Sequence, residues 1–209
     1  SEKGVQEAKK SGKLLQELNV NFDICFTSFL KRAINTLEII LKVLGRDNNY
    51  TKAWELNERH YGALTGLNKD ETKKKLGEEQ FKKYRRSWNI PPPHLDKDSK
   101  YSSHNDPLYK SLKNIPSTES LKDTYDRVVP YFEKNIEKYL RENKNIIISA
   151  HGNTIRALGK KIFNVSDKSI NLLEIPTGNP LIIHFDNLGK VLSAKYLDES
   201  RKTEIISNQ

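Results

Sequence analysis

The segment 145–163 constrains the fold more than any other part of the sequence. Its first six residues hold three consecutive isoleucines, and such a short apolar run is typical of a buried strand. A helical pattern follows at 155–163, after a turn that contains Gly152. The same order occurs at 23–26 and 28–45. Repeated strand-then-helix units predict an α/β fold with a mostly parallel central sheet flanked by helices.

Two helices in the first quarter of the chain are predicted from their apolar periodicity. Residues 1–18 form an amphipathic pattern with Ser1 as its cap. In the second helix, apolar residues recur every three or four positions, Ser28 is the expected cap, and Gly45 ends the pattern. Residues 53–56 are expected to form a further strand.

The remaining elements are predicted from their capping residues and breakers. Asn68 caps a helical stretch that breaks near Gly77 and continues to about Trp88. Further predictions are a helix over 120–143 distorted at Pro130, a short helix over 166–173, and a hairpin of strands 181–185 and 191–197.

A long polar segment interrupts these elements. The sequence has 209 residues, which suits one generous domain. Within it, Pro91-Pro92-Pro93 ends a helix, and residues 94–117 are rich in Ser, Asn, Asp and Lys. We interpret 91–118 as a lid-like polar insertion of a single domain spanning 1–209, and a plain surface insertion is the alternative.

The charge balance favours an anionic partner. The formal net charge is +9 and the pI is about 9.4, which suits nucleic acid, an anionic membrane or a small phosphorylated substrate. The sequence contains no zinc-finger spacing and no basic region leading into heptads, and its apolar runs are too short to span a bilayer. We therefore expect no nucleic acid and no membrane as partners. The single Cys25 and the absence of a secretion signal favour a cytoplasmic protein.

His151 is the first candidate for chemistry. It follows the predicted strand 145–150, and open α/β sheets bind their ligands at the carboxyl ends of strands. The next helix offers free backbone N–H groups, so a phosphate fits beside Gly152 and Asn153. A structural, hydrogen-bonding histidine is the alternative.

A second group of candidates surrounds Glu58. Arg59 and Tyr61 follow it directly, and a partly buried glutamate in a phosphate site can deliver and retrieve protons. A surface ion pair is the alternative. Arg32 and the pair Arg85-Arg86 supply guanidinium groups that suit phosphate and carboxylate oxygens, although most arginines are simply solvated.

In chain order, these motifs resemble those of cofactor-dependent phosphoglycerate mutases, which belong to the histidine phosphatase superfamily. The resemblance spans nearly the whole chain. It rests on residues 27–28, 30–33, 56–64, 66–69, 77–80, 85–87, 90–93, 117–124, 150–153 and 175–178. The Glu58-Arg59-His60-Tyr61 string and the proline-led insertion separate this family from general histidine phosphatases.

The resemblance implies a role for each matching residue. Glu58 would donate and accept protons, His151 would stabilise the transferring phosphoryl group, and Arg32 would bind phosphate. The substrate's phosphate or carboxylate would be held by Arg59, Tyr61, Lys69, Arg85 and Arg86, with Gly152 and Asn153 at the phosphate. The implied reaction interconverts 3-phosphoglycerate and 2-phosphoglycerate, primed by 2,3-bisphosphoglycerate and without metal. We also expect a homo-oligomer.

One family feature is missing from the sequence. The family's first strand ends in Arg-His-Gly, whose histidine carries the phosphoryl group, and no such string occurs here. We expect that strand to lie upstream, and its absence to leave unpaired strand edges and an apolar gap. The alternatives are a bisphosphoglycerate mutase or phosphatase, an inactive phosphate-binding module, and a nucleic-acid binder.

Overall fold

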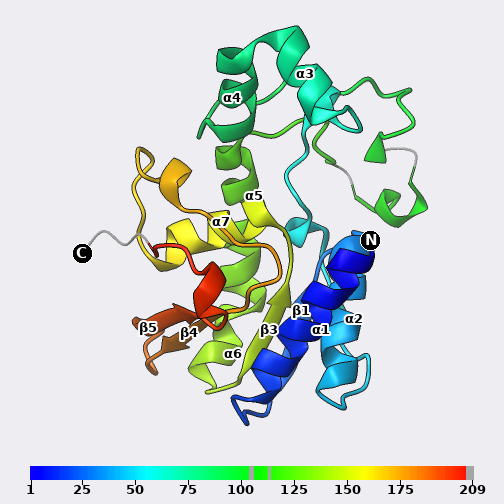
Figure 1. Ribbon diagram of the computed structural model, residues 1–209. Coiled ribbons are helices and arrows are strands. Elements are labelled where there is room, and N and C mark those ends of the chain that lie inside the picture. The colour runs from blue at the N-terminus through cyan, green and yellow to red at the C-terminus, as the bar shows by residue number, and fades with distance from the viewer. Residues whose placement is uncertain (104–105, 113, 206–209) are drawn as a thin grey trace. The chain divides into compact units, whose positions relative to one another are not determined.

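The computed structural model describes residues 1–103, 106–112 and 114–205 (Figure 1). The chain divides into two compact units. The first contains Ser1–Glu58 and Arg127–Gln209, and the second contains Arg59–Asp126. The polar insertion predicted over 91–118 is therefore described without positions 104, 105 and 113.

A parallel three-stranded sheet forms the centre of the first unit. Its order is β2 (Thr51–Lys52), β1 (Ile24–Thr27), β3 (Ile146–Ser149). Phe26 is aligned with Thr51 on one side and with Ile148 on the other. The predicted terminal hairpin is also present, as antiparallel β4 (Leu181–Phe185) and β5 (Val191–Tyr196). The α/β prediction is confirmed.

Helices cover the sheet of the first unit. They are α1 (Glu2–Gln16), α2 (Lys31–Val43), α6 (Glu137–Arg141), α7 (Gly152–Ile162) and the last part of α5 (Leu121–Asn135). The hydroxyl of Ser1 accepts from the N–H of Gly4, so the predicted cap of α1 is confirmed. In the part of the chain that the structure describes, every helix is too short or too polar to cross a membrane.

The main core lies between α1, α2 and the sheet. Leu37 and Leu41 of α2 are fully buried, and they cluster with Leu15 of α1, Cys25 of β1 and Ile147 of β3. Burying each large aliphatic side chain stabilises the fold by about 1.5–3 kcal/mol. The three- and four-residue apolar spacing of α2 therefore fixes its orientation over β1 and β3.

Four local predictions are corrected by the structure. Residues 53–56 do not form a strand: the strand is the exposed pair Thr51–Lys52, and Trp54–Leu56 is a 3₁₀ turn with Leu56 buried. The helix predicted over 120–143 is divided at Ile136 into α5, which contains Pro130, and α6. The predicted helix at 166–173 is reduced to the 3₁₀ turn Ile170–Leu172.

The fourth correction concerns Ser28. It was predicted as the cap of α2, but the residue in the capping position is Leu30, whose N–H donates to the Ser28 hydroxyl. Ser28 is completely buried. Its hydroxyl is instead part of the candidate site described below.

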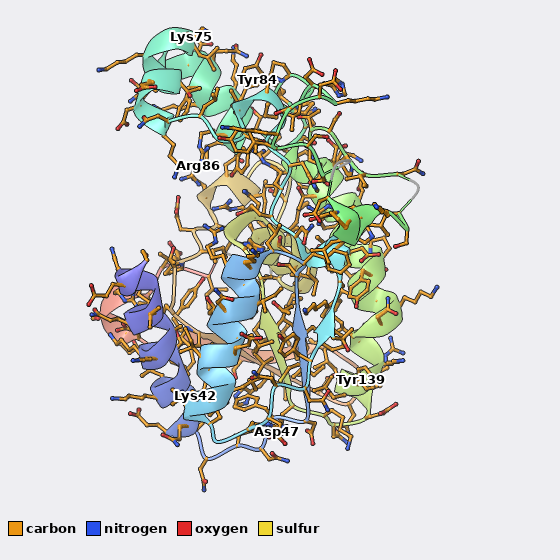
Figure 2. All side chains as sticks on the ribbon, turned by 90° about the vertical axis from the view of Figure 1, so that its right-hand side faces the viewer. Lys42, Asp47, Lys75, Tyr84, Arg86 and Tyr139 are labelled. Atoms are coloured by element: carbon orange, nitrogen blue, oxygen red, sulfur yellow. The ribbon has the colours of Figure 1, made fainter. Side chains whose placement is uncertain are left out.

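The second unit contains two short helices and the polar insertion. Asn68 caps α3 (Lys69–Leu76) through the N–H groups of the first turn, and Gly77 separates it from α4 (Glu78–Arg86), as predicted. Figure 2 labels Lys75 near that connection and Arg86 at the opposite end of α4. The described ends of the insertion are tied together, because the Leu95 N–H donates to the Ser117 carbonyl at 3.2 Å.

A cavity of about 710 Å³ lies in the first unit beside β3 and β4, and its lining includes every residue of both strands. Among the described residues, β3 pairs only with β1, and β4 pairs only with β5. Each strand therefore has an edge whose N–H and C=O groups are not used in a ladder. The lining is mostly apolar and includes Leu15, Ile40 and Leu158. We call this space the β3–β4 slot.

Candidate active site

His151 lies at the junction between β3 and α7, buried to 3% exposure. Its Nδ1 is 3.1 Å from Nη2 of Arg32, and its Nε2 is 2.8 Å from the hydroxyl of Ser28. A guanidinium only donates, so Nδ1 accepts and the ring proton sits on Nε2. The His151 pKa is lowered to about 4, mainly by burial; Glu58 opposes this shift, and the charges of Arg32 and Arg127 add to it. The imidazole is therefore neutral at pH 7.

Glu58 approaches the same histidine from the turn after Trp54–Leu56. Its Oε1 accepts from the N–H of Asn153 at 3.2 Å, and its Oε2 is 4.0 Å from Nη2 of Arg32. The Glu58 side chain is 20% exposed. Arg32 and Glu58, which the sequence analysis names as candidates beside His151, therefore lie close to it in the structure.

The amino end of α7 supplies backbone donors at this place. The residue before the helix, His151, has no side-chain capping bond, so the first N–H groups of α7 are available to an anion or to Glu58. Asn153 is held by its neighbour one turn on, because its Oδ1 accepts from Nη1 of Arg156 at 2.8 Å. Three cationic or dipolar groups, namely Arg32, His151 and the α7 end, thus meet at one carboxylate.

The burial of neutral His151 predicts a loss of stability in acid. In the unfolded chain its pKa is about 6.5, so that state binds the proton first as pH falls. The free energy of unfolding should therefore decrease from about pH 6.5 down to about pH 4, the folded pKa, by roughly 3 kcal/mol. Urea unfolding of the chain and of His151→Gln across this range would measure it. Equal pH slopes in both proteins would contradict the prediction.

In the second unit, three of the predicted binding residues lie together. The guanidinium groups of Arg59 and Arg85 lie 4.5 and 4.9 Å from the centre of the Tyr61 ring. Nη2 of Arg59 also donates to the carbonyl of Tyr84 at 2.8 Å. Stacking on one ring and bonding to the end of α4 fix the orientation of both arginines.

Lys69, the first residue of α3, lies between Tyr61 and Arg85 in the chain, and Arg86, the last residue of α4, directly follows Arg85. The backbone that carries Arg59 and Tyr61 is fixed at His60. Oε2 of the buried Glu119 accepts from both the N–H and Nδ1 of His60, at 2.9 and 2.8 Å, and Glu119 N–H donates back to the His60 carbonyl. Gly62 is required next, because a Cβ there would lie 2.1 Å from the carbonyl oxygen of Pro93.

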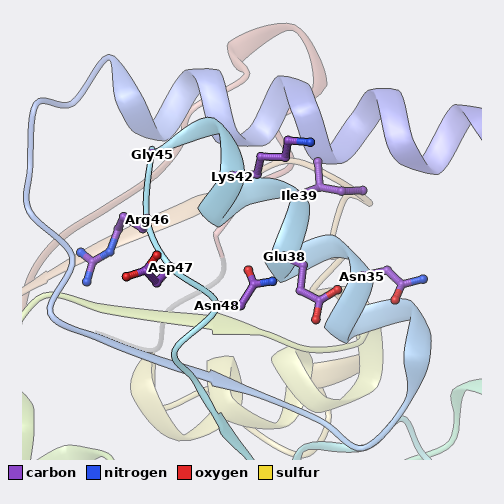
Figure 3. Close-up of a pocket in the computed structure, with 8 residues that line it drawn as sticks. All are labelled: Asn35, Glu38, Ile39, Lys42, Gly45, Arg46, Asp47 and Asn48. Carbon is purple, nitrogen blue, oxygen red and sulfur yellow. The ribbon is translucent and has the colours of Figure 1, made fainter.

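A separate hollow lies beside the second half of α2 and does not include the predicted site residues (Figure 3). Its charged side chains have both signs: Glu38 and Asp47 are anionic, and Lys42 and Arg46 are cationic. Glu38 also accepts a hydrogen bond of 2.6 Å from the Tyr50 hydroxyl. This hollow lacks the one-signed charge that a phosphate site needs. Within the described residues, no group of three or more His, Cys, Asp or Glu side chains is arranged to hold a metal.

Comparison of the sequence with known families gives a match over residues 1–197 to the "Histidine phosphatase superfamily (branch 1)", which covers all of the second unit and the first unit up to residue 197. Two curated relatives are each called "2,3-bisphosphoglycerate-dependent phosphoglycerate mutase". The one from Pelagibacter ubique is 49% identical over 97% of this chain and 86% of the relative. The one from Treponema denticola is 50% identical over 97% of this chain and 83% of the relative.

Solved structures agree on the fold. "Bacillus stearothermophilus YhfR" has a TM-score of 0.68 at 21% identity, covering 99% of this chain and 86% of that one. The alpha-ribazole phosphatase from Shigella flexneri has a TM-score of 0.64 at 18% identity, covering 91% of this chain and 80% of that one. From the family match and the sequence relatives together, this chain belongs to the histidine phosphatase superfamily and, within it, to the family of the 2,3-bisphosphoglycerate-dependent phosphoglycerate mutases.

Proposed function

We propose that this chain carries the machinery of a glycolytic phosphoglycerate mutase, which interconverts 3-phosphoglycerate and 2-phosphoglycerate and is primed by 2,3-bisphosphoglycerate. One observation carries the proposal: Arg32, His151 and Glu58 come together at the amino end of α7 from three separate segments. Arg32 contacts His151 at 3.1 Å and Glu58 at 4.0 Å, and Glu58 accepts from the N–H of Asn153. Cationic donors beside a carboxylate are what metal-free phosphoryl transfer requires.

Arg32 and His151 would stabilise the transferring phosphoryl group. The equatorial oxygens of that group spread negative charge in the transition state, and fixed donors aimed at them lower the barrier. Arg32 supplies a permanent charge beside His151 Nδ1. A bound phosphate dianion favours the protonated imidazole, so His151 would gain a proton and donate from both nitrogens.

Glu58 would move the proton of the substrate hydroxyl. The hydroxyl that attacks a phosphoryl group must lose a proton, and the alkoxide that leaves must gain one, so a single carboxyl group can serve both directions. In the structure Oε1 is held by the Asn153 N–H, while Oε2 faces Arg32.

The side chains that the resemblance names as binding residues would hold the substrate's phosphate or carboxylate. Arg59, Tyr61, Lys69, Arg85 and Arg86 offer cations and a phenol that suit a phosphate and a carboxylate. The stacked arrangement of Arg59, Tyr61 and Arg85 supports this assignment, because it holds guanidinium groups in fixed directions.

The phosphoryl carrier is proposed to be a histidine outside residues 1–209, on a strand that ends in Arg-His-Gly and occupies the β3–β4 slot. The slot supports this proposal, since it presents two open strand edges and an apolar lining next to the strand that leads to His151.

We also propose a cytoplasmic location and a homo-oligomer. A bisphosphoglycerate mutase or phosphatase uses the same groups, and relative rates of transfer and hydrolysis would separate them.

The binding assignment predicts a tenfold or larger effect at Arg86. Arg86→Ala removes charge-assisted hydrogen bonds worth about 1.5–3 kcal/mol, which corresponds to roughly a 10- to 100-fold weaker affinity. Calorimetric titration of the 209-residue chain with 2,3-bisphosphoglycerate would measure this. Arg46→Ala, at the hollow of Figure 3, is the matched control and should bind normally. Equal affinities for both variants would remove Arg86 from the site, and binding by neither the chain nor its variants would contradict the proposed function.

A further inference from the structure

One guanidinium group holds the whole turn that presents Glu58. Arg127 lies in the second turn of α5. Its Nη1 donates to the carbonyl of Glu55 at 2.6 Å, and its Nη2 donates to the carbonyls of Asn57 and Glu58 at 3.1 and 3.3 Å. The same group lies 5.6 Å from the centre of the Trp54 ring. A rigid fork of donors is thus matched to three carbonyl oxygens in four consecutive residues.

Two further contacts hold the turn from other sides. The hydroxyl of the buried Thr154, in α7, donates to the Asn57 carbonyl at 2.6 Å. The N–H of Phe29 donates to the Asn57 side chain at 2.9 Å. Arg127 supplies charged donors to this turn, and a hydrogen bond from a charged group is roughly twice as strong as a neutral one.

We propose that Arg127 is a positioning residue for the mutase reaction: it fixes the backbone of Glu58 so that the carboxylate stays at the Asn153 N–H, beside Arg32 and His151. The inference rests on the proposed function of Glu58. Arg127 donates to three main-chain oxygens of this turn, so we assign it a positioning role rather than a catalytic one. Its effect reaches the carboxylate through the Glu58 main chain, whose carbonyl it binds directly.

The fork and the charge of Arg127 make separate contributions. The hydrogen bonds of the guanidinium group hold Glu58 in position. The charge acts on His151, whose charged neighbours are Glu58, Arg32 and Arg127, with the neutral Ser28 hydroxyl on its Nε2. Replacing Arg127 by an uncharged residue should raise the His151 pKa, since a repelling positive charge is removed. A residue needed only for stability would alter neither property in the folded protein.

Two variants separate these contributions. Arg127→Lys keeps the charge but replaces the two donor nitrogens with a single one, which cannot reproduce this geometry, and Arg127→Gln loses both the charge and the geometry. Turnover is to be measured in a chain joined to a strand ending in Arg-His-Gly, and the His151 pKa by NMR titration of the 209-residue chain. Arg141→Gln is the control, because Arg141 is an exposed arginine of α6 that pairs with Glu137. Circular dichroism shows which variants are folded.

For both Arg127 variants we expect kcat to fall about 10- to 100-fold, because small misplacements of a catalytic group have effects of this size. KM for 3-phosphoglycerate should change less than about threefold, since the substrate contacts remain. The His151 pKa should rise in Arg127→Gln and stay low in Arg127→Lys. A folded Arg127→Gln with normal kcat would overturn the inference, and so would a loss that appears only in KM. If Glu58→Gln is also fully active, the proposed function itself has failed.

Discussion

Incubated with 2,3-bisphosphoglycerate, the 209-residue chain should gain no stable phosphoryl group, and the same chain supplied with a strand ending in Arg-His-Gly should gain one. Intact mass spectrometry measures both outcomes directly. The expectation follows from the proposed function, in which the phosphohistidine lies on that strand and His151 only stabilises the group in transfer. Turnover should therefore change from undetectable to measurable when the strand is added.

The β3–β4 slot is the physical basis for adding the strand as a separate peptide. A strand there can pair with the open edges of β3, which has four residues, and of β4, which has five. Each large apolar side chain that enters the cavity of about 710 Å³ stabilises the complex by about 1.5–3 kcal/mol. Without an occupant, open edges next to apolar surface favour aggregation, so the peptide should also raise solubility and Tm.

Two control peptides separate filling of the slot from chemistry. A peptide ending in Arg-Ala-Gly should raise Tm as much as the original and give no phosphorylation. A peptide with prolines inside the strand cannot donate to either ladder and should do neither. If the chain alone becomes phosphorylated on a histidine, the carrier lies within residues 1–209 and the assignment of the missing strand is wrong.

The fold was predictable where the apolar period was unambiguous. The spacing of leucines and isoleucines in α2 and the isoleucine run of β3 each allow one interpretation, and both elements were predicted within a few residues. The prediction failed at 53–56, where a short apolar segment fits either a strand or a 3₁₀ turn. The choice there is made by tertiary packing, because Leu56 is buried and Arg127 binds the carbonyls around it.

The candidate site was predictable only in part, for a related reason. His151 and the segment around Glu58 were found because strand ends and charged strings are visible in sequence. Ser28 was noticed as a helix cap, whereas its bond to His151 joins residues 123 positions apart. Arg127 gave no sequence signal, since its partners lie about 70 positions away in the chain. Pairings between distant residues depend on the register of β1 with β3 and on how α5 packs, and neither follows from local pattern.

In a chain that also carries the Arg-His-Gly strand, Glu58→Gln should bind phosphoglycerate and lose most of its turnover. The amide has the shape of the carboxylate, and its oxygen can still accept from the Asn153 N–H, so the substrate site should keep its geometry. An amide cannot take or return a proton at neutral pH. General acid–base catalysis contributes about 10²- to 10⁴-fold, so kcat should fall by that factor, equivalent to about 3–5 kcal/mol in the barrier.

Steady-state kinetics with 3-phosphoglycerate and calorimetric binding would test this prediction together, because it requires a large loss in kcat with affinity changed less than a few fold. Glu38→Gln is the matched control: it makes the same chemical change at a glutamate that binds the Tyr50 hydroxyl, in the hollow away from His151, and should leave kcat unchanged. Near-normal turnover in Glu58→Gln would mean that another group moves the proton. The contacts of Glu58 with Arg32 and the Asn153 N–H would then form only an ion pair. A phosphate could bind there only by displacing the Glu58 carboxylate from these donors.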